Sequence, residues 1–272
     1  MNNFIQISFQ SIPPEQQEIL IAHLAEAGYE GFEESDTGLK AFVSEKNYDK
    51  ELLCEITFKY QISFNEQVIP ETNWNAVWES NFQPVIVDDF VAIRADFHEP
   101  ITGVEREIII TPKMSFGTGH HATTFMMIRE MREIDFTGKT VFDFGTGTGI
   151  LAILAEKLGA EKILAADNDD WSIANATENA IKNNCSKIEV KKMITLLHND
   201  KYDVVLANIN KNVIVDNFSS LVKLLAPEGI LLLSGLLEED EPEMMEVAGK
   251  FPLLFREKTT RNNWMTLRFC IH

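Results

Sequence analysis

Three glycines separated by single residues lie between a hydrophobic run and a helical pattern. Gly145, Gly147 and Gly149 follow "TVFDF" and precede "ILAILAEKLG". Glycine permits a tight turn and lets a ligand approach the main chain closely, and the start of a helix offers unpaired N–H groups. In a parallel sheet, ligands collect at the carboxyl ends of the strands. The loop is therefore typical of a site for a nucleotide-like cofactor.

Two acidic residues help to choose between candidate cofactors. Asp143 lies just before the loop, and Asp167 ends the next predicted strand, 22 positions after Gly145. A dinucleotide enzyme would show G-x-G-x-x-G, with its third glycine one residue later, and the Asp143 carboxylate would repel a pyrophosphate. S-adenosylmethionine carries an ammonium and a sulfonium but no phosphate, and Asp167 could accept hydrogen bonds from its ribose hydroxyls. An NAD-dependent oxidoreductase and a turn without a ligand are the alternatives.

A further candidate lies at the end of another predicted strand. Asn208 ends "YDVVLAN", beside the point at which the strand order of such a sheet reverses. An asparagine carbonyl can accept hydrogen bonds from an amine. Several amino-group methyltransferases have N-P-P-[YF] here, whereas Ile209, Asn210 and Lys211 follow in this chain. The competing interpretation is a turn, where asparagine is common.

The segment "MSFGTGHHATT" contains two more glycines and precedes a predicted helix. Thr123 or Thr124 could cap that helix or contact the ligand. His120 and His121 are adjacent, which suits chelation of a metal on one face poorly, so we expect no metal site.

The elements that must hold these residues alternate along the second half of the chain. From Thr140 onward, "TVFDF", "KILAAD", "KIEVKK", "YDVVLAN" and "GILLLSG" predict strands, and helical patterns separate them. This alternation predicts an α/β fold, a doubly wound Rossmann-like parallel sheet with helices on both faces. The final segment, "PLLFREKTTRNNWMTLRFCIH", predicts an antiparallel terminal hairpin at the sheet edge. Trp264, in this segment, could line the pocket of the expected cofactor site or pack in the hydrophobic core.

The first 65 residues show a different order of elements, β-α-β-β-α-β. "FIQISF" predicts the first strand, "YDKELLCEI" the second helix and "FKYQISFN" the closing strand. This order predicts a small ferredoxin-like α+β domain over residues 1–65. Residues 66–82 predict a linker helix, with Trp74 and Trp78 on one face; plain aromatic packing is the alternative for these two. Residues 83–272 then form the cofactor-binding domain.

Composition narrows the classes of function. The chain has 272 residues and a net charge of −18. Such a charge repels phosphate backbones, so no nucleic-acid requirement is expected and a basic or amine-bearing partner is favoured; solubility alone is the alternative reason for the acidity. No apolar run approaches the roughly 20 residues of a membrane helix, and no secretory signal is visible. The three cysteines indicate reduced thiols. We expect a cytoplasmic monomer without membrane contact.

The motifs together resemble the bacterial methyltransferase family that modifies large-subunit ribosomal protein eleven. The resemblance covers nearly the whole chain, through "SFGTGHHATT", "DFGTGTGILAI", "ATENAIKNN", "ANI", "LSGLL" and "WNAVWESNFQPVIV". Two positions depart from the family pattern: "ANINK" replaces A-N-I-L-A, and Ala122 replaces a proline.

The resemblance implies a methyltransferase that uses S-adenosylmethionine to modify amines of a ribosomal protein, both lysine side chains and the N-terminal α-amine. It implies an N-terminal substrate-recognition domain joined by a helix to a class I methyltransferase domain. It carries the family's cofactor contacts onto Thr124, Gly145, Asp167 and Asn208; Asp143, Gly147 and Gly149 are added by the loop itself, and Asn208 is the catalytic candidate. A methyltransferase acting on a nucleic-acid or small-molecule amine is the alternative, and a cofactor-binding fold without catalysis is another.

Overall fold

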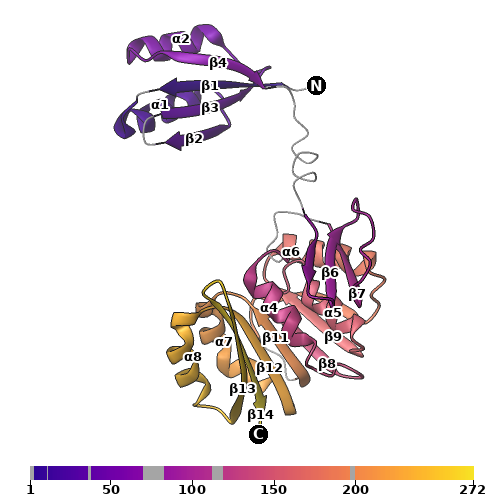
Figure 1. Cartoon of the computed structure of the whole chain (residues 1–272). Helices are drawn as coiled ribbons and strands as arrows, with labels where there is room; N and C mark the ends of the chain where they lie inside the picture. Colours follow the sequence, from indigo (N-terminus) through magenta and orange to yellow (C-terminus); the bar gives the residue numbers. More distant parts are fainter. Residues whose placement is uncertain (1–2, 11, 36–37, 70–82, 112–118, 197–199) are drawn as a thin grey trace. The chain divides into compact units, whose positions relative to one another are not determined.

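The chain folds into two compact units, Met1–Asn81 and Phe82–His272 (Figure 1). The computed structural model describes residues 3–10, 12–35, 38–69, 83–111, 119–196 and 200–272. One hydrophobic cluster lies in the first unit and two lie in the second. Because each unit buries its own apolar side chains, each is described by itself.

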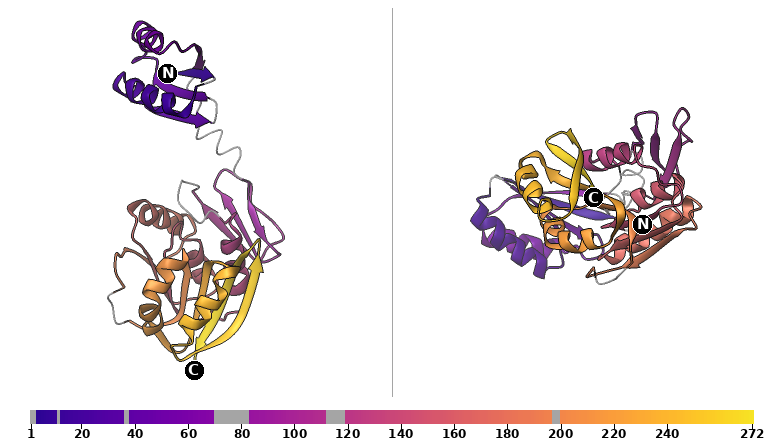
Figure 2. Two further views of the ribbon diagram at one scale, coloured as in Figure 1. Left: turned by 90° about the vertical axis from the view of Figure 1, so that its left-hand side faces the viewer. Right: turned by 90° about the horizontal axis from the view of Figure 1, so that it is seen from below.

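The first unit is a four-stranded antiparallel sheet with two helices. Its strands lie in the order β2-β3-β1-β4. Alternate residues of β1, Ile5, Ile7 and Phe9, are buried against Leu20 of α1 and Leu53 of α2, so both helices cover the same sheet face (Figure 2). The elements are β1 (Phe4–Gln10), α1 (Pro14–Glu26), β2 (Gly31–Ser35), β3 (Gly38–Ser44), α2 (Lys50–Lys59) and β4 (Phe64–Ile69).

The last strand of this unit lies further along the chain than the sequence predicted. Helix α2 continues to Lys59, and the Thr57 hydroxyl donates to the carbonyl of Leu53 (2.9 Å) inside it. The strand prediction for "FKYQISFN" is therefore wrong over its first six residues, and β4 begins at Phe64. Residues 66–69 belong to β4 and not to a linker helix. The rest of the predicted linker, residues 70–82 with Trp74 and Trp78, lies outside the described residues.

The second unit is built on a seven-stranded sheet in the order β10-β9-β8-β11-β12-β14-β13. Its first five strands pair in parallel, and β14 and β13 pair antiparallel at one edge. The predicted α/β alternation is confirmed. The elements are β8 (Thr140–Phe144), α5 (Ile150–Lys157), β9 (Lys162–Asp167), α6 (Asp170–Lys182), β10 (Ile188–Lys192), β11 (Tyr202–Asn208), α7 (Lys211–Lys223), β12 (Leu225–Leu237), η1 (Glu238–Asp240), α8 (Glu241–Ala248), β13 (Leu253–Arg261) and β14 (Trp264–Ile271).

The central strands are buried on both faces, and their side chains alternate between two cores. Along β8, Val141 belongs to one hydrophobic cluster and Phe142 to the other. Along β11, Leu206 and Ala207 divide in the same way. Successive side chains of a strand point to opposite faces, which explains why these strands read as continuous apolar runs. Helices α4 (Ala122–Met131) and α5 cover the first face, and α7 and α8 cover the second (Figures 1 and 2).

A smaller three-stranded sheet precedes the large one and packs on its first face. It consists of β5 (Val85–Val87), β6 (Val91–Ala95) and β7 (Arg106–Ile110), and helix α4 (Ala122–Met131) follows it. Strands β6 and β7 pair in parallel, and the buried Arg94 of β6 forms a bidentate ion pair with Glu107 of β7 (2.8 and 3.0 Å). The pair joins the two strands on the side away from the core.

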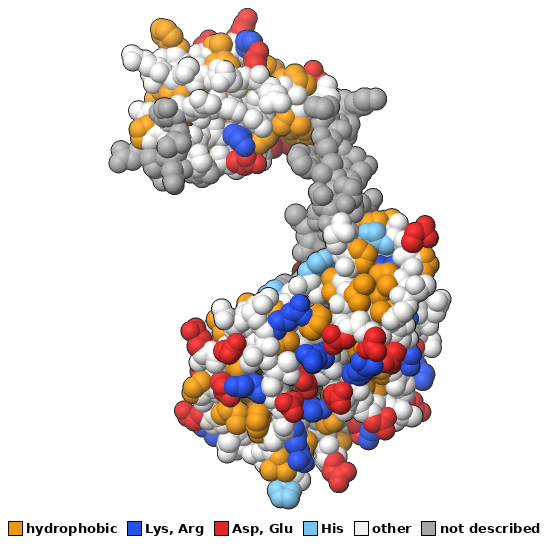
Figure 3. Space-filling model, in the orientation of Figure 1, with side chains coloured by type: hydrophobic (Ala, Val, Ile, Leu, Met, Phe, Trp, Pro, Cys, Tyr) orange, Lys and Arg blue, Asp and Glu red, His pale blue; other side chains and the backbone are white. Residues whose placement is uncertain are grey.

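The surface of the second unit mixes acidic and basic side chains on the face shown in Figure 3. Among the described residues, every helix is too short or too polar to span a membrane.

Candidate cofactor and amine site

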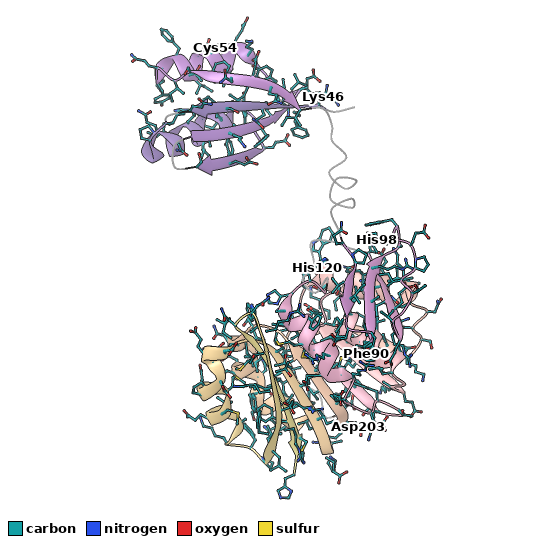
Figure 4. All side chains as sticks on the ribbon, in the orientation of Figure 1. Lys46, Cys54, Phe90, His98, His120 and Asp203 are labelled. Atoms are coloured by element: carbon teal, nitrogen blue, oxygen red, sulfur yellow. The ribbon has the colours of Figure 1, made fainter. Side chains whose placement is uncertain are left out.

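A cavity of about 560 Å³ opens at the carboxyl ends of the parallel strands. It lies where β8 and β11 are neighbours although β9 and β10 follow β8 in the chain, which is the switch point of the sheet. The lining comes from the loops after β8, β9, β10 and β11, from the start of α4 and from the terminal strands. Asp203, at the opposite end of β11, is labelled in Figure 4.

The glycine loop adopts backbone angles that favour glycine. Gly145, Gly147 and Gly149 have φ values of +76°, +54° and +82°. A Cβ atom on Gly145 would lie 2.2 Å from Cγ2 of Ile209, and one on Gly149 would lie 3.2 Å from Ala176. The N–H groups of Gly145 and Thr146 both donate to the carbonyl of Ala166 (2.9 Å each). The loop is thus held tightly between β9, α6 and the residue after β11.

Asp143 lies beneath this loop and not on the cavity surface. Its side chain is 1% exposed and accepts a hydrogen bond from the Thr146 hydroxyl (2.6 Å). The pKa of Asp143 is raised to about 7, mainly by burial; the hydrogen bond from the Thr146 hydroxyl opposes this rise, and the nearby Asp167 carboxylate contributes to it. The sequence predicted that Asp143 contacts the cofactor. In the structure, Asp143 instead contacts Thr146 of the glycine loop, and this loop lines the cavity.

Asp167 lies at the rim of the cavity, at the end of β9. One carboxylate oxygen accepts from the N–H of Gly147 (2.9 Å), and the other accepts from the N–H of Asp169 (3.1 Å). Each carboxylate oxygen can accept more than one hydrogen bond, so the residue can both brace the loop and accept hydroxyl groups of a ligand.

Asn208 and Thr124 meet at the centre of the cavity lining, from β11 and from the first turn of α4. The Asn208 amide donates to the Thr124 hydroxyl (3.3 Å), and both side chains are almost fully buried. The Asn208 carbonyl oxygen is buried and has no hydrogen-bond partner among the described residues. A buried acceptor without a partner is unfavourable, so this oxygen is suited to an N–H group of a ligand.

The structure shows that His121, and neither threonine, caps helix α4. His121 Nδ1 accepts from the N–H of Thr123 (3.4 Å) and pairs with the Thr123 hydroxyl (2.8 Å). The rings of His121 and Trp264 meet edge to face at 4.7 Å, and both line the cavity. His120, labelled in Figure 4, instead pairs with the carbonyl of Gln83. The two adjacent histidines therefore contact different parts of the chain: His121 caps α4, and His120 contacts Gln83.

Several lining residues were missed from the sequence. Met193, Ile194 and Leu196 follow β10 and provide an apolar wall. Any loop after a parallel strand is a candidate for such a wall, and this general signal could have found them. Gly235 in β12 has φ +85°, and a Cβ there would lie 2.0 Å from the carbonyl oxygen of Ile209. No local pattern marks that contact.

The departure "ANINK" from the family pattern has a structural explanation. Asn210 is the N-cap of α7 and accepts from the N–H of Val213 (3.1 Å). Lys211 pairs with Asp240 (2.9 Å) and Glu243 (2.8 Å) near the start of α8. The two replaced residues begin a helix and anchor it to the next one.

The cavity lining carries little positive charge. Among the described lining residues there is no lysine or arginine, and the one carboxylate is Asp167. Phosphate groups are held by cations and by exposed N–H groups, whereas here Asp167 already occupies the Gly147 N–H. The site can accept hydroxyls and amines at Asp167 and Asn208, and it suits a ligand without phosphate.

A family model, curated relatives and a solved structure that resemble this chain all carry the same description. Residues 6–270 match the protein family described as ribosomal protein L11 methyltransferase. A protein of that name from Porphyromonas gingivalis is 39% identical over 260 residues, which are 93% of this chain and 90% of the relative. Another from Bacteroides fragilis is 34% identical over 98% of this chain and 99% of the relative. A crystal structure titled ribosomal protein L11 methylase, from Lactobacillus delbrueckii subsp. bulgaricus, superposes with a TM-score of 0.65 at 28% identity and covers 70% of this chain and all of that one.

Proposed function

Because this chain belongs to the ribosomal protein L11 methyltransferase family, we propose that it transfers methyl groups from S-adenosylmethionine to amines of ribosomal protein L11. The motif resemblance seen in the sequence is thereby confirmed. The observation that carries the proposal is the unpartnered Asn208 oxygen, buried in a cavity that the glycine loop closes on one side. The acceptors are lysine side chains and the N-terminal α-amine.

The residues present fit S-adenosylmethionine as the methyl donor. Asp167 is placed to accept the ribose hydroxyls, and Met193, Ile194 and Leu196 offer apolar surface to the adenine. The glycine backbone leaves room for the methionine part of the donor. That part carries an ammonium and no phosphate, so the site needs no cation to neutralise a phosphate. Thr124 and Asn208 lie together where they can contact both the donor and the incoming amine.

Positioning is the main contribution that these side chains can make to methyl transfer. The donor supplies an activated methyl group, and the attacking amine must present its lone pair in line with the breaking bond. A lysine with an unperturbed pKa of about 10.4 must first lose a proton. Burial lowers the pKa of a lysine, and the Asn208 oxygen can accept a hydrogen bond from the neutral amine. Trp264 and His121 exclude water on that side of the cavity.

The second unit is a class I methyltransferase domain with an antiparallel terminal hairpin. The first unit is a ferredoxin-like domain that recognises the substrate, and its boundary moves from residue 65 to at least Ile69, where β4 ends. Its strand order β2-β3-β1-β4 and its β-α-β-β-α-β sequence support this class. The net charge of −18 favours a basic protein substrate over a nucleic acid.

Calorimetry on the full chain tests the choice of cofactor. We expect S-adenosylmethionine and its demethylated product to bind at one site and NAD not to compete, because the described lining residues include no lysine or arginine that could hold a pyrophosphate. Binding of NAD without any signal from S-adenosylmethionine would overturn the proposal.

A further inference from the structure

Three asparagines lie on one buried side of helix α6, two of them within the helix and the third at its C-cap. Asn175, Asn179 and Asn183 are spaced by four residues, and their exposures are 0%, 0% and 9%. Residues four apart lie on the same helix face, and a core-facing stripe is usually apolar because buried amides need partners. The hydrogen-bond partners of these amides therefore indicate the role of the three asparagines.

Asn179 joins two segments that are distant in sequence. Its Nδ2 donates to the carbonyl of Thr148 (2.8 Å), and its Oδ1 accepts from the N–H of Thr111 (2.7 Å). A carbonyl can only accept and an N–H can only donate, so the amide has one orientation that satisfies both. One side chain thus connects the glycine loop to the residue that follows β7.

The Thr148 carbonyl belongs to the last peptide of the glycine loop. The N–H on the other side of this peptide, that of Gly149, donates to the carbonyl of Thr146 (2.8 Å). Ala176, on the same helix as Asn179, packs against Gly149 closely enough that an added Cβ would lie 3.2 Å away. Helix α6 therefore fixes the peptide from which α5 starts, and Thr148 itself lines the cavity.

Asn183 provides an internal comparison. Its amide accepts from the N–H of Ile109 (3.0 Å) and donates to the carbonyls of Ile109 (2.6 Å) and Asn179 (2.8 Å). Like Asn179 it holds β7 against α6, but none of these hydrogen bonds reaches the glycine loop. The two residues share a structural role, and Asn179 alone adds a contact with the cavity lining.

We infer that Asn179 is a positioning residue for the methyl donor, acting through the Thr148 carbonyl; the inference rests on the proposed function. Its amide keeps this carbonyl directed into the protein, so the glycine loop presents a fixed backbone to the donor before binding. Without the Asn179 Nδ2 group, the buried Thr148 carbonyl loses this hydrogen bond, and the glycine loop must rearrange or take up water. The methyl donor then binds more weakly, because a loop that is no longer fixed in advance must be ordered when the donor binds.

The test compares Asn179→Asp with Asn183→Asp in the full chain. Each substitution keeps the acceptor for a backbone N–H in β7 or directly after it and removes the amide that donates to a backbone carbonyl, so the two are matched in their expected effect on stability. Donor dissociation constants come from calorimetry with S-adenosylmethionine, methyl transfer from kcat at saturating donor, and stability from thermal unfolding. Asn179→Ser, which is uncharged and too short to span both partners, serves if Asn179→Asp does not fold.

We expect the Asn179 variant to raise the donor Kd by about tenfold, the effect of one hydrogen bond. Its kcat at saturating donor stays within about twofold of wild type, and the Asn183 variant keeps its donor Kd within the same factor. Equal weakening by both variants would show that Asn179 acts only through general stability, which overturns the inference. An unchanged Kd in the Asn179 variants overturns it as well. No donor binding by the wild-type chain would overturn the proposed function and this inference together, so the two failures are distinguishable.

Discussion

At the scale of single residues, buried polar atoms without a hydrogen-bond partner indicate where a ligand can bind. Five side-chain atoms in the described residues are buried without a hydrogen-bond partner, and they belong to Tyr29, Glu130, Asp143, Asn208 and Arg268. Glu130 and Arg268 lie beside each other at 3.6 Å, and Asp143 lies below the glycine loop. Of the five residues, Asn208 is the one in the cavity lining. Of these five atoms, its oxygen is therefore the one that belongs to a cavity-lining residue.

The substitution Asn208→Ala should slow methyl transfer while keeping the fold. It removes an acceptor that the amine uses in the transition state, which costs on the order of 1–3 kcal/mol, or roughly 5- to 150-fold in rate. The measurement is single-turnover methylation at saturating donor, because Asn208 also lies near the donor and its loss can weaken donor binding.

Thr124→Val is a companion variant for the same experiment, since it removes the hydroxyl to which the Asn208 amide donates and leaves the Asn208 oxygen in place. A wild-type rate for Asn208→Ala at saturating donor would show that Asn208 is only a residue that ends a strand.

Asp143 gives a prediction about pH. Its pKa is raised to about 7 by burial, against an unfolded value of about 3.9. Between these values the unfolded chain releases the proton and the native chain keeps it, so the contribution of Asp143 to stability falls as pH rises. The substitution Asp143→Asn replaces the carboxyl group with a neutral amide that resembles its protonated form, and it should remove this dependence.

The measurement is the melting temperature of wild type and Asp143→Asn across the pH range. We expect the variant's advantage to be larger at about pH 8 than at about pH 5. Parallel profiles for the two proteins would show that Asp143 is already ionised in the native state throughout.

Element by element, the sequence was informative wherever local patterns decide the structure. The strand, glycine loop and helix from Thr140 to Lys157 follow from apolar runs and glycine spacing, and the structure has them there. The end of α2 was misplaced because the continuation of a helix and the start of a strand look alike in a short apolar stretch. Trp264 was a candidate for the pocket wall, but contacts between distant segments leave no local pattern, which is why its contact with His121 and that of Gly235 with Ile209 could not be predicted.

Gly235 tests how closely the elements around the cavity must fit. An added Cβ would lie 2.0 Å from the backbone oxygen of Ile209, the residue after Asn208, so Gly235→Ala must displace that backbone. We expect loss of donor binding by at least about tenfold in addition to reduced stability. Calorimetry and thermal unfolding provide the two measurements.

Gly138→Ala is the matched control for this substitution. Gly138 also has a positive φ, +68°, but an added Cβ there meets nothing within 4 Å. It therefore shows the cost of backbone strain alone, about 1–2 kcal/mol. Equal donor affinity in the two alanine variants would contradict a close fit between Gly235 and Ile209.

At the scale of the whole molecule, the chain forms two units, each with its own core. The cavity and all of its described lining residues belong to the second unit. The first unit contributes no lining residue among those described, and we propose above that it recognises the substrate. Donor binding and substrate recognition should therefore be separable.

Removal of residues 1–81 should leave donor affinity within about twofold of the full chain and reduce transfer to ribosomal protein L11 by at least about tenfold. The first value comes from calorimetry and the second from methylation of the purified substrate protein. Full activity of the shortened chain on that protein would show that the first unit does not recognise the substrate.

The most direct test of the central claim is methylation of purified ribosomal protein L11 by the full chain with methyl-labelled S-adenosylmethionine. We predict that the label enters L11 at lysine side chains and at the N-terminal α-amine, that intact mass rises by whole methyl groups, and that Asn208→Ala slows the transfer under the same conditions. Binding of S-adenosylmethionine without any label in L11, or label in ribosomal RNA in its place, would contradict the account.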